Sequence, residues 1–506
     1  MIDYAVHSEA FLDSESSLPF DSVFDHFNPD QPKLRHILYN TYEEFIRFAE
    51  THKVRPVVIK EMQKAMICDS FDLGFDLYAC PQCDEEYLFF HKCHSRLCPS
   101  CGKKLQMMIE ANVDAISVNT EHRHIVFTIP DVYRDLFRAD RELLNLLFIA
   151  ARNTIAITVN KHLFKQIKAD YGVFNKNDYD YTYVLRNYPD AKVFGMIATL
   201  HTFGRDLKWN PHIHAIVPEA VYNPVKGSVE KFYYFNYSFL RKTWMYEINR
   251  LMDNYLTACP LPGINFRRDY RNPSYDRQIK GYYVYAKKNS QFEVEDFNSC
   301  GKADETKAKE NEQNIDGVIK YMIRYAARPA MAESRLLKLD TDRKIVTWYY
   351  DDHKTGDRIT VEEPSLELVK KLILHVPDEN FKMVRYYGFY HPKQSDILDI
   401  LQQHFGGKDK LKKTKEGRKK RKKKNRNRKK FRTVSIDTYN RDPMKCKCGA
   451  YLAYQTSWVN PDRNKPFFAD RCIRKNIAVK KENDQRRARI LRENQQRKQR
   501  QCHPRL

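Results

Sequence analysis

Two histidines separated by one apolar residue, His212 and His214, follow a turn sequence at residues 204–210. Residues 211–217 are mostly apolar or β-branched, which predicts a strand, and a proline is tolerated at the first position of a strand. Because side chains alternate between the two faces of a strand, both imidazoles project from one face and Ile213 from the other. Paired imidazoles on a rigid strand are a suitable start for a divalent-metal site, although two ordinary strand histidines have the same spacing.

A second group of reactive side chains occurs in residues 314–329. Apolar residues recur there at intervals of three and four, which predicts a helix, and a proline ends it. Tyr321 and Tyr325 lie one turn apart on the other side of this helix, with Arg324 and Arg328 beside them. A phenol has a pKa of about 10 and is a weak nucleophile at neutral pH, so it would need nearby cations and a metal-polarised phosphate. Guanidinium groups suit phosphate oxygens, but an amphipathic surface helix is the alternative interpretation.

Cysteine spacing indicates a structural zinc site. The chain contains 12 cysteines, and six of them lie between residues 68 and 101. Two Cys-x-x-Cys pairs, Cys80/Cys83 and Cys98/Cys101, have 14 residues between them, so we expect these four thiolates to complete one zinc-ribbon tetrahedron. Such a module folds around its metal because it buries little apolar surface by itself. Cys93 could replace one of the four ligands, and the surplus candidates that leave a second metal open are Cys68, Cys93, His91 and His94.

Positive charge is concentrated near the C-terminus. Of the net charge of +23, the stretch from Lys408 to Arg432 carries +15, because 17 lysines and arginines stand there against two acidic residues. Such a block is typical of a disordered arm that binds a polyanion, with a solubilising linker as the alternative. The residues expected to contact DNA are Arg418, Lys419, Lys420 and Arg421 in this arm, and Lys103 and Lys104 beside the zinc module.

The elements needed to position these groups predict an α+β protein. A buried strand is expected at 124–130, helices at 143–164 and 239–256, and a strand at 193–203 that leads through the turn into the histidine strand. Two strands joined by a short turn form an antiparallel hairpin, so the histidine pair should lie in the middle of an antiparallel sheet backed by helices.

The chain is long enough for several domains, and its 42% hydrophobic content argues against general disorder. No apolar run reaches the roughly 18 residues of a membrane helix, and no secretory signal begins the chain, so we expect no membrane partner and a cytoplasmic protein. The expected division is a helical region at 1–66, a zinc-binding module at 67–110, a catalytic domain at 120–395 with a polar insertion at about 287–313, a basic arm at 404–433, and a tail at 434–506.

In this order, the motifs resemble those of the two-tyrosine rolling-circle insertion-sequence transposases, members of the His-hydrophobe-His endonuclease superfamily. The resemblance runs from about Tyr39 to Pro392 and includes the cysteine module, the strand at 124–130, the turn and histidine pair, both tyrosines, and the stretch from His375 to Gly388. The basic arm and the tail lie outside it. Cys446-x-Cys448 in the tail suggests a second metal knuckle with no evident partner pair, since only Cys472, Cys502 and His503 follow it.

The resemblance implies a nuclease that acts on single-stranded DNA in the bacterial nucleoid. His212 and His214 would bind Mg²⁺ or Mn²⁺, and Tyr321 or Tyr325 would attack the scissile phosphate to form a 5′-phosphotyrosine and free a 3′-hydroxyl. The other tyrosine would serve the next strand during rolling-circle transposition, and the Zn²⁺ module would help to recognise the end of the element. Candidates for a third ligand are Asp206, His201 and His124, of which the carboxylate would favour Mg²⁺ or Mn²⁺.

Two other functions stay open at this stage. A rolling-circle replication initiator or a relaxase would use the same chemistry, although the cysteine module and the Tyr-x-x-x-Tyr pair favour a transposase. A non-catalytic zinc-ribbon DNA-binding protein would explain the cysteines and the charge. That interpretation leaves the histidine pair and the aligned tyrosines and arginines as coincidences.

Overall fold

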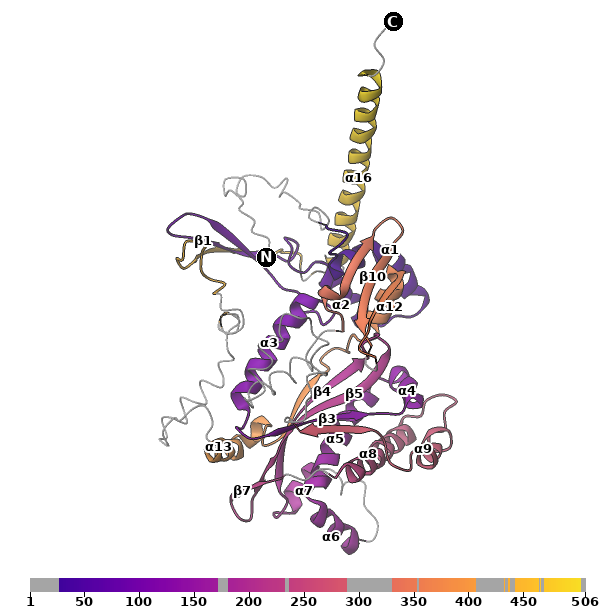
Figure 1. The fold of residues 1–506 in the computed structure, drawn as a ribbon, viewed down its shortest axis with the longest axis vertical. Coiled ribbons are helices and arrows are strands. Elements are labelled where there is room, and N and C mark those ends of the chain that lie inside the picture. Colours follow the sequence, from indigo (N-terminus) through magenta and orange to yellow (C-terminus); the bar gives the residue numbers. More distant parts are fainter. Residues whose placement is uncertain are drawn as a thin grey trace. The chain divides into compact units, whose positions relative to one another are not determined.

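The computed structural model describes residues 27–171, 181–232, 236–288, 330–352, 355–405 and 442–463, residues 432, 436 and 465, and helix 468–501. The chain forms two compact units, whose elements are labelled in Figure 1. The first unit comprises residues 1–104, 329–379 and 431–506, and the second comprises residues 105–328 and 380–430. Residues 329–379, which fall within the expected catalytic domain at 120–395, belong to the first of these compact units.

The second unit is built on a seven-stranded antiparallel sheet. Six strands run in the order β7-β6-β4-β5-β3-β8, and β12 also pairs with β4. The strands are β3 (His122–Thr128), β4 (Val193–Phe203), β5 (Trp209–Pro218), β6 (Ala220–Asn223), β7 (Ser228–Lys231), β8 (Val284–Lys288) and β12 (Val384–Gly388). The expected α+β class with an antiparallel sheet is therefore confirmed.

The β4–β5 hairpin occupies the centre of this sheet. Its turn is closed by two backbone hydrogen bonds of 3.1 Å, from Gly204 N to Lys208 O and from Leu207 N to Gly204 O. The strands then pair in antiparallel register from Phe203 and Trp209 outward. The hairpin predicted from the turn sequence is present, and it places the histidine strand between β4 and β3.

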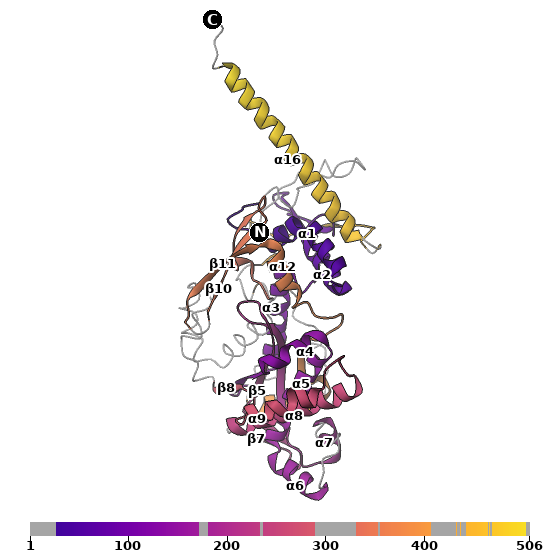
Figure 2. The same cartoon turned by 90° about the vertical axis from the view of Figure 1, so that its right-hand side faces the viewer.

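Two long helices cover one face of the sheet. They are α5 (Leu143–Val159) and α8 (Tyr237–Ala258), which pack against each other as Figure 2 shows. Trp244 of α8 is fully buried, its ring centroid lies 4.9 Å from that of Phe127, and its Nε1 donates to the carbonyl of Thr128 (2.6 Å). This face is the main apolar core of the unit.

The helix expected at 143–164 is interrupted at Asn160. The side chain of Asn160 accepts a hydrogen bond from Lys192 N (2.8 Å) and donates to Lys192 O (3.1 Å), so it binds backbone that precedes β4. A second helix begins directly afterwards. The other α-helices among the described residues of this unit are α4 (Arg134–Ala139), α6 (Lys161–Tyr171), α7 (Tyr181–Asn187), α9 (Asn272–Arg277), α13 (Ser395–His404) and most of α3 (Pro99–Ile116).

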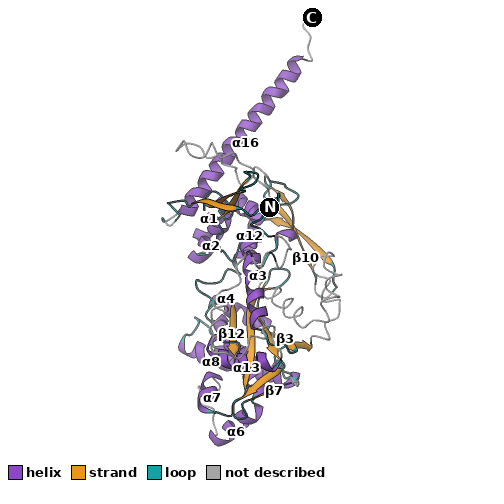
Figure 3. Ribbon diagram, turned by 90° about the vertical axis from the view of Figure 1, so that its left-hand side faces the viewer, coloured by secondary structure: helices purple, strands orange, loops and turns teal. Residues whose placement is uncertain are grey.

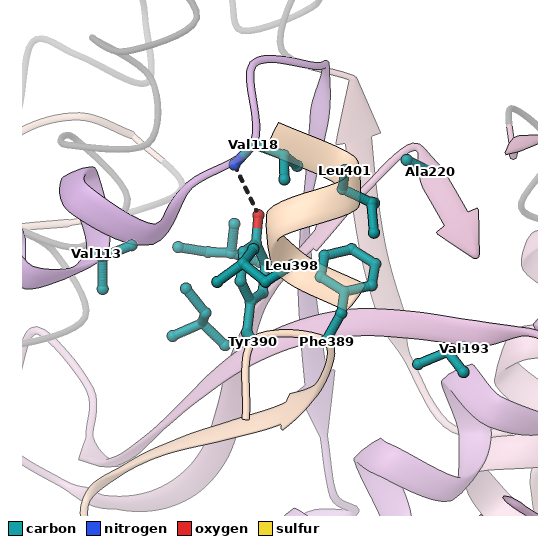
Figure 4. Packing of buried hydrophobic residues seen from close by; sticks show 10 residues of the cluster. Val113, Val118, Val193, Ala220, Phe389, Tyr390, Leu398 and Leu401 are labelled. Atoms are coloured by element: carbon teal, nitrogen blue, oxygen red, sulfur yellow. Dashed lines mark hydrogen bonds between the residues drawn. The ribbon is translucent and has the colours of Figure 1, made fainter. Parts of the chain in front are cut away.

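A smaller apolar cluster covers part of the opposite face, as Figure 4 shows. Ile197 of β4 and Ile216 of β5 pack there with residues from α3 and α13, and with the chain that follows β12. Tyr390 is part of this cluster, and its hydroxyl accepts a hydrogen bond from Val118 N (3.4 Å). The histidines of β4 and β5 lie on this same face, beyond Ile197 and Ile216 along the strands.

The first unit contains two three-stranded antiparallel sheets, and Figure 3 distinguishes its strands from its helices. One sheet has the order β11-β10-β9 and the other the order β13-β1-β2. The strands are β1 (Phe75–Ala79), β2 (Glu86–Phe90), β9 (Leu336–Asp340), β10 (Ile345–Asp351), β11 (Arg358–Pro364) and β13 (Ala453–Trp458), and the helices are α1 (Leu34–Thr51), α2 (Pro56–Met66), α12 (Ser365–Ile373) and α16 (Phe468–Gln501). Across the part of the chain that the structure describes, no helix has the length and apolar character needed to cross a membrane.

Candidate metal centres

Three histidine side chains converge on the middle strands of the seven-stranded sheet: His201 of β4, and His212 and His214 of β5. One ring nitrogen from each lies within 4.8 Å of the other two. His201 stands opposite His212 in the hairpin register, and opposed residues of an antiparallel pair share a face. His214 lies two residues further along and shares that face too. The hairpin thus adds His201, one of the three candidate third ligands, to the predicted pair.

The reverse face of the hairpin is apolar. Leu200, Ile213 and Ala215 are fully buried. The alternation predicted for the histidine strand is therefore confirmed, and the strand cannot shift by one residue without exchanging its core residues for imidazoles. The buried apolar face fixes the positions of the histidines.

A backbone carbonyl orients His212. Its Nδ1 lies 2.7 Å from the carbonyl oxygen of Asn210. A carbonyl oxygen only accepts hydrogen bonds, so Nδ1 carries the proton and Nε2 keeps a lone pair. Metal-bound histidines commonly donate their second ring N–H to such an oxygen, which fixes the ring. His212 is thus arranged as an Nε2 ligand.

Burial keeps the imidazoles of His212 and His214 neutral. It lowers the pKa of His212 to about 4 and the pKa of His214 well below its usual value, with further lowering of His214 by the neighbouring histidines. Loss of hydration disfavours the imidazolium form, while a neutral imidazole is the form that binds a metal. His212 and His214 are therefore suited in charge, and all three side chains in position, to coordinate a divalent cation.

His124 and Asp206, the other two candidates for the third ligand, are not members of this three-histidine cluster. His124 of β3 contacts His214, with 2.8 Å between its Nε2 and Nδ1 of His214. Asp206 lies in the hairpin turn, where it accepts from Lys208 N (3.2 Å) and pairs with Lys208 Nζ (2.9 Å). Neither completes the cluster that His201 completes. A role of Asp206 as a metal ligand stays a prediction, and in this structure its carboxylate pairs with the neighbouring Lys208.

Three imidazoles form a nitrogen donor set. Such a set suits divalent first-row transition metals, whereas Mg²⁺ prefers oxygen ligands. The residues present therefore fit Mn²⁺ better than Mg²⁺, provided that water or substrate oxygens complete the coordination. The four predicted nucleophile and phosphate-binding residues, Tyr321, Tyr325, Arg324 and Arg328, lie outside the described residues.

The cysteines form two separate clusters instead of one. The first consists of Cys68, Cys93, Cys98 and Cys101, all buried, whose Sγ atoms lie within 4.8 Å of one another. Cys101 Sγ is 3.7 Å from Cys68 Sγ and 3.6 Å from Cys93 Sγ. A Zn–S bond of about 2.3 Å in a tetrahedron requires about 3.8 Å between sulfurs, so this cluster fits a zinc ion.

The second cluster joins Cys80 and Cys83 to Cys446 and Cys448. The expectation that Cys80, Cys83, Cys98 and Cys101 share one tetrahedron is therefore wrong. β1 and β2 carry the first Cys-x-x-Cys pair on their connecting turn, whereas the second pair begins α3 beside the end of α2. Cys68 and Cys93, which spacing left as surplus, complete the α3 site.

The nearby histidines take no part in either cysteine cluster. His91 has its ring nitrogens 3.3 Å from Leu73 O and 3.3 Å from Asp76 Oδ1. Lys103 and Lys104 lie on the first turns of α3, directly after Cys101, where Lys103 is exposed. Their DNA contacts stay a prediction, as do those of Arg418, Lys419, Lys420 and Arg421, which lie outside the described residues.

Two family models match the chain. One, described as a putative transposase, matches residues 195–396 and includes the whole histidine cluster. The other, described as a transposase zinc-binding domain, matches residues 37–129 and includes the whole first cysteine cluster but only Cys80 and Cys83 of the second.

Two known proteins resemble the chain over most of its length. It is 23% identical over 435 residues to the transposase for insertion sequence element IS801 of Pseudomonas savastanoi pv. phaseolicola, covering 82% of this chain and 88% of that protein. It is 25% identical over 356 residues to the putative transposase y4qJ of Sinorhizobium fredii, covering 68% and 78%. No solved structure matches the chain.

The zinc-binding match precedes the transposase match along the chain. Together the two matches define the class as a transposase with an amino-terminal zinc-binding domain. The resemblance inferred from the motifs is confirmed. The chain belongs to the insertion-sequence transposase family.

Proposed function

We propose that this protein cuts and joins single-stranded DNA during transposition, with a divalent cation held by His201, His212 and His214. The observation that carries the proposal is the convergence of three buried imidazoles on the central strands of the sheet. One ring nitrogen of each lies within 4.8 Å of the other two, close enough for a single divalent cation to bind all three. A shared cation accounts for all three at once.

The cation would supply Lewis-acid polarisation of the scissile phosphate and neutralise part of its developing charge. The protein contributes the fixed arrangement of the ligands. Asn210 O holds the tautomer of His212, and the hairpin register holds His201 opposite it. A site fixed in advance on strands needs little rearrangement when the phosphate binds.

The nucleophile we propose is Tyr321 or Tyr325. The phenolic oxygen would form a bond to phosphorus while the bond from phosphorus to the 3′ oxygen breaks. The phenol loses its proton, the leaving oxygen gains one, and a 5′-phosphotyrosine remains. A second exchange of the same kind joins this phosphate to a new 3′-hydroxyl, so no external energy source is required.

Arg324 and Arg328 would hold the phosphate oxygens, since guanidinium groups bind them in a bidentate manner. The basic stretch between Lys408 and Arg432 would add affinity that depends little on DNA sequence. This part of the proposal rests on residue type and spacing, together with the names of the two transposases that the chain resembles.

Cleavage of an end-labelled single strand from the ends of the element tests the proposal. We expect cutting by the native protein with Mn²⁺ or Mg²⁺, none after chelation, and none by His212→Ala. Cutting that persists in His212→Ala, or without any divalent cation, would overturn the metal-assisted mechanism. DNA binding without cutting over a range of metals and strands would instead favour a non-catalytic DNA-binding protein.

A further inference from the structure

The second cysteine cluster joins parts of the chain that are far apart in sequence. Cys80 and Cys83 lie between β1 and β2, while Cys446 and Cys448 precede β13. The Sγ–Sγ distances are 3.4 Å for Cys80–Cys448, 3.5 Å for Cys83–Cys446 and 3.8 Å for Cys83–Cys448. A tetrahedral zinc thiolate requires about 3.8 Å, and a disulfide requires about 2.05 Å.

Each pair of cysteines stands on a tight, hydrogen-bonded turn. In the first turn, Cys80 N donates to Glu85 O (2.9 Å) and Asp84 N to Cys80 O (3.0 Å). In the second turn, Cys446 N donates to Ala450 O (2.9 Å). Gly449 has φ +95°, a backbone conformation that suits glycine. The two hydrogen-bonded turns therefore hold the four thiols close together.

The sheet beside this cluster has few fully buried side chains. β13 pairs with β1 from Phe75 opposite Trp458 to Ala79 opposite Ala453, yet residues 453–457 of β13 are all exposed. Among the described residues, the buried members of the apolar cluster here are Cys80, Cys446 and Leu452, and five partly buried side chains pack against them: Tyr78, Tyr87, Phe89, Met444 and Ala450. A sheet of this size generally needs a metal or disulfides for stability.

We propose that Cys80, Cys83, Cys446 and Cys448 bind a second structural Zn²⁺, which fastens β13 to the β1–β2 hairpin. The matched zinc-binding domain ends at residue 129 and therefore lacks half of this site. The site goes beyond the proposed function, because it uses no residue of the histidine cluster and requires no DNA.

A neighbouring side chain contacts the cluster. Tyr87 Oη lies 3.3 Å from Cys446 Sγ. Zinc binds thiolates, and hydrogen bonds from groups around a metal site orient its ligands.

The two zinc sites differ in exposure. All four cysteines of the first cluster are buried, whereas Cys83 and Cys448 of the second are exposed. A chelator should therefore reach the second site first.

Metal content of the full-length protein tests the proposal. Because the histidine cluster can also bind zinc, all samples carry His201→Ala and His212→Ala, and they are purified under a reducing agent. Elemental analysis should give two zinc ions per chain for this reference and one after the added pair Cys446→Ser and Cys448→Ser. The matched control, Cys259→Ser with Cys472→Ser, alters cysteines outside both clusters and should keep two.

Two further measurements test the proposal without requiring that the Cys446/Cys448 variant folds. A chromogenic chelator added to the reference protein should release one zinc ion quickly and the other slowly. Hydrogen exchange at residues 453–458 should accelerate after the first release, while exchange at β4 and β5 stays unchanged. An unchanged zinc count in the Cys446/Cys448 variant would overturn the proposal. So would iron in place of zinc, or disulfides between the two pairs in the reduced reference.

Discussion

His124 Nε2 lies 2.8 Å from His214 Nδ1, and the two rings are stacked with centroids 5.1 Å apart. Of these two nitrogens one donates and the other accepts. If His214 donates, its Nε2 keeps a lone pair that can bind a cation beside His201 and His212. His124 is then a positioning residue that fixes the tautomer of a ligand without binding the metal itself.

Removing His124 should therefore weaken cation binding. We expect His124→Ala to raise the Kd for Mn²⁺ by about 10- to 100-fold, the usual effect of losing a hydrogen-bond partner of a ligand. His124→Gln should recover part of this loss, because its amide oxygen can accept the same hydrogen bond. Titration of Mn²⁺ followed by electron paramagnetic resonance measures both variants. Equal Kd values for the native protein and His124→Ala would contradict the role.

Comparing variants of His201 and Asp206, two residues near the hairpin turn, tests which of them is the third ligand. His201→Ala removes a member of the cluster, so Mn²⁺ affinity should fall by more than about 100-fold, beyond the effect of an outer partner. Asp206→Ala removes a carboxylate that pairs with Lys208, so affinity should change by less than about 3-fold. The same titration checks both variants, and a larger loss in Asp206→Ala than in His201→Ala would identify the carboxylate as the ligand.

Local pattern was sufficient to predict the hairpin, the alternation of its faces and the histidine pair. The third ligand needed the register. To predict that His201 faces His212, the centre of the turn must be located to within one residue. The strand pairing is also irregular between His201 and Phe203. A one-residue error would place a different residue of β4 opposite His212, which is why spacing left His201, His124 and Asp206 open.

The cysteine partners could not be predicted for a different reason. Cys80 and Cys448 are 368 residues apart, and only the pairing of β13 with β1 brings them together. The two Cys-x-x-Cys pairs in one short stretch have the ligand spacing of a single zinc ribbon. The signal available in the sequence is the Cys446-x-Cys448 pair followed by Gly449. Such a pair supplies half of a zinc site, so it requires a partner pair elsewhere in the chain.

Gly388 provides a test of the fold around β12. It has φ +59°, and an added Cβ would lie 1.6 Å from Phe194 O, so Gly388→Ala should reduce the free energy of unfolding by about 3 kcal/mol or more. Gly227→Ala is the matched control in the same unit, since it has φ +61° with nothing within 4 Å, and it should cost only about 1 kcal/mol. Urea unfolding measures both. Equal losses would show that β12 does not pair with β4 as described.

The basic stretch is expected to act by binding phosphates. Replacing Arg418, Lys419, Lys420 and Arg421 by alanine should flatten the dependence of log K on log salt by about 0.7 for each single-strand phosphate that is no longer bound. Fluorescence anisotropy with a labelled oligonucleotide at several salt concentrations gives this slope.

The matched control for the basic stretch removes two lysines from the first unit. Lys60 and Lys481 pair with Glu379 and Glu43, and their alanine variants should leave the salt slope unchanged. An unchanged slope in the fourfold variant would mean that residues 418–421 do not contact DNA.

The proposed function depends above all on a tyrosine that becomes covalently joined to DNA under the control of the histidine cluster. To test this directly, the protein is incubated with Mn²⁺ and a 3′-labelled single strand from the element's ends, and the products are separated on a denaturing gel. We predict a labelled protein–DNA adduct that is lost in Tyr321→Phe with Tyr325→Phe and in His201→Ala, and that persists in Asp206→Ala. Cleavage by the native protein without an adduct, or an adduct that survives loss of both tyrosines, would contradict the mechanism.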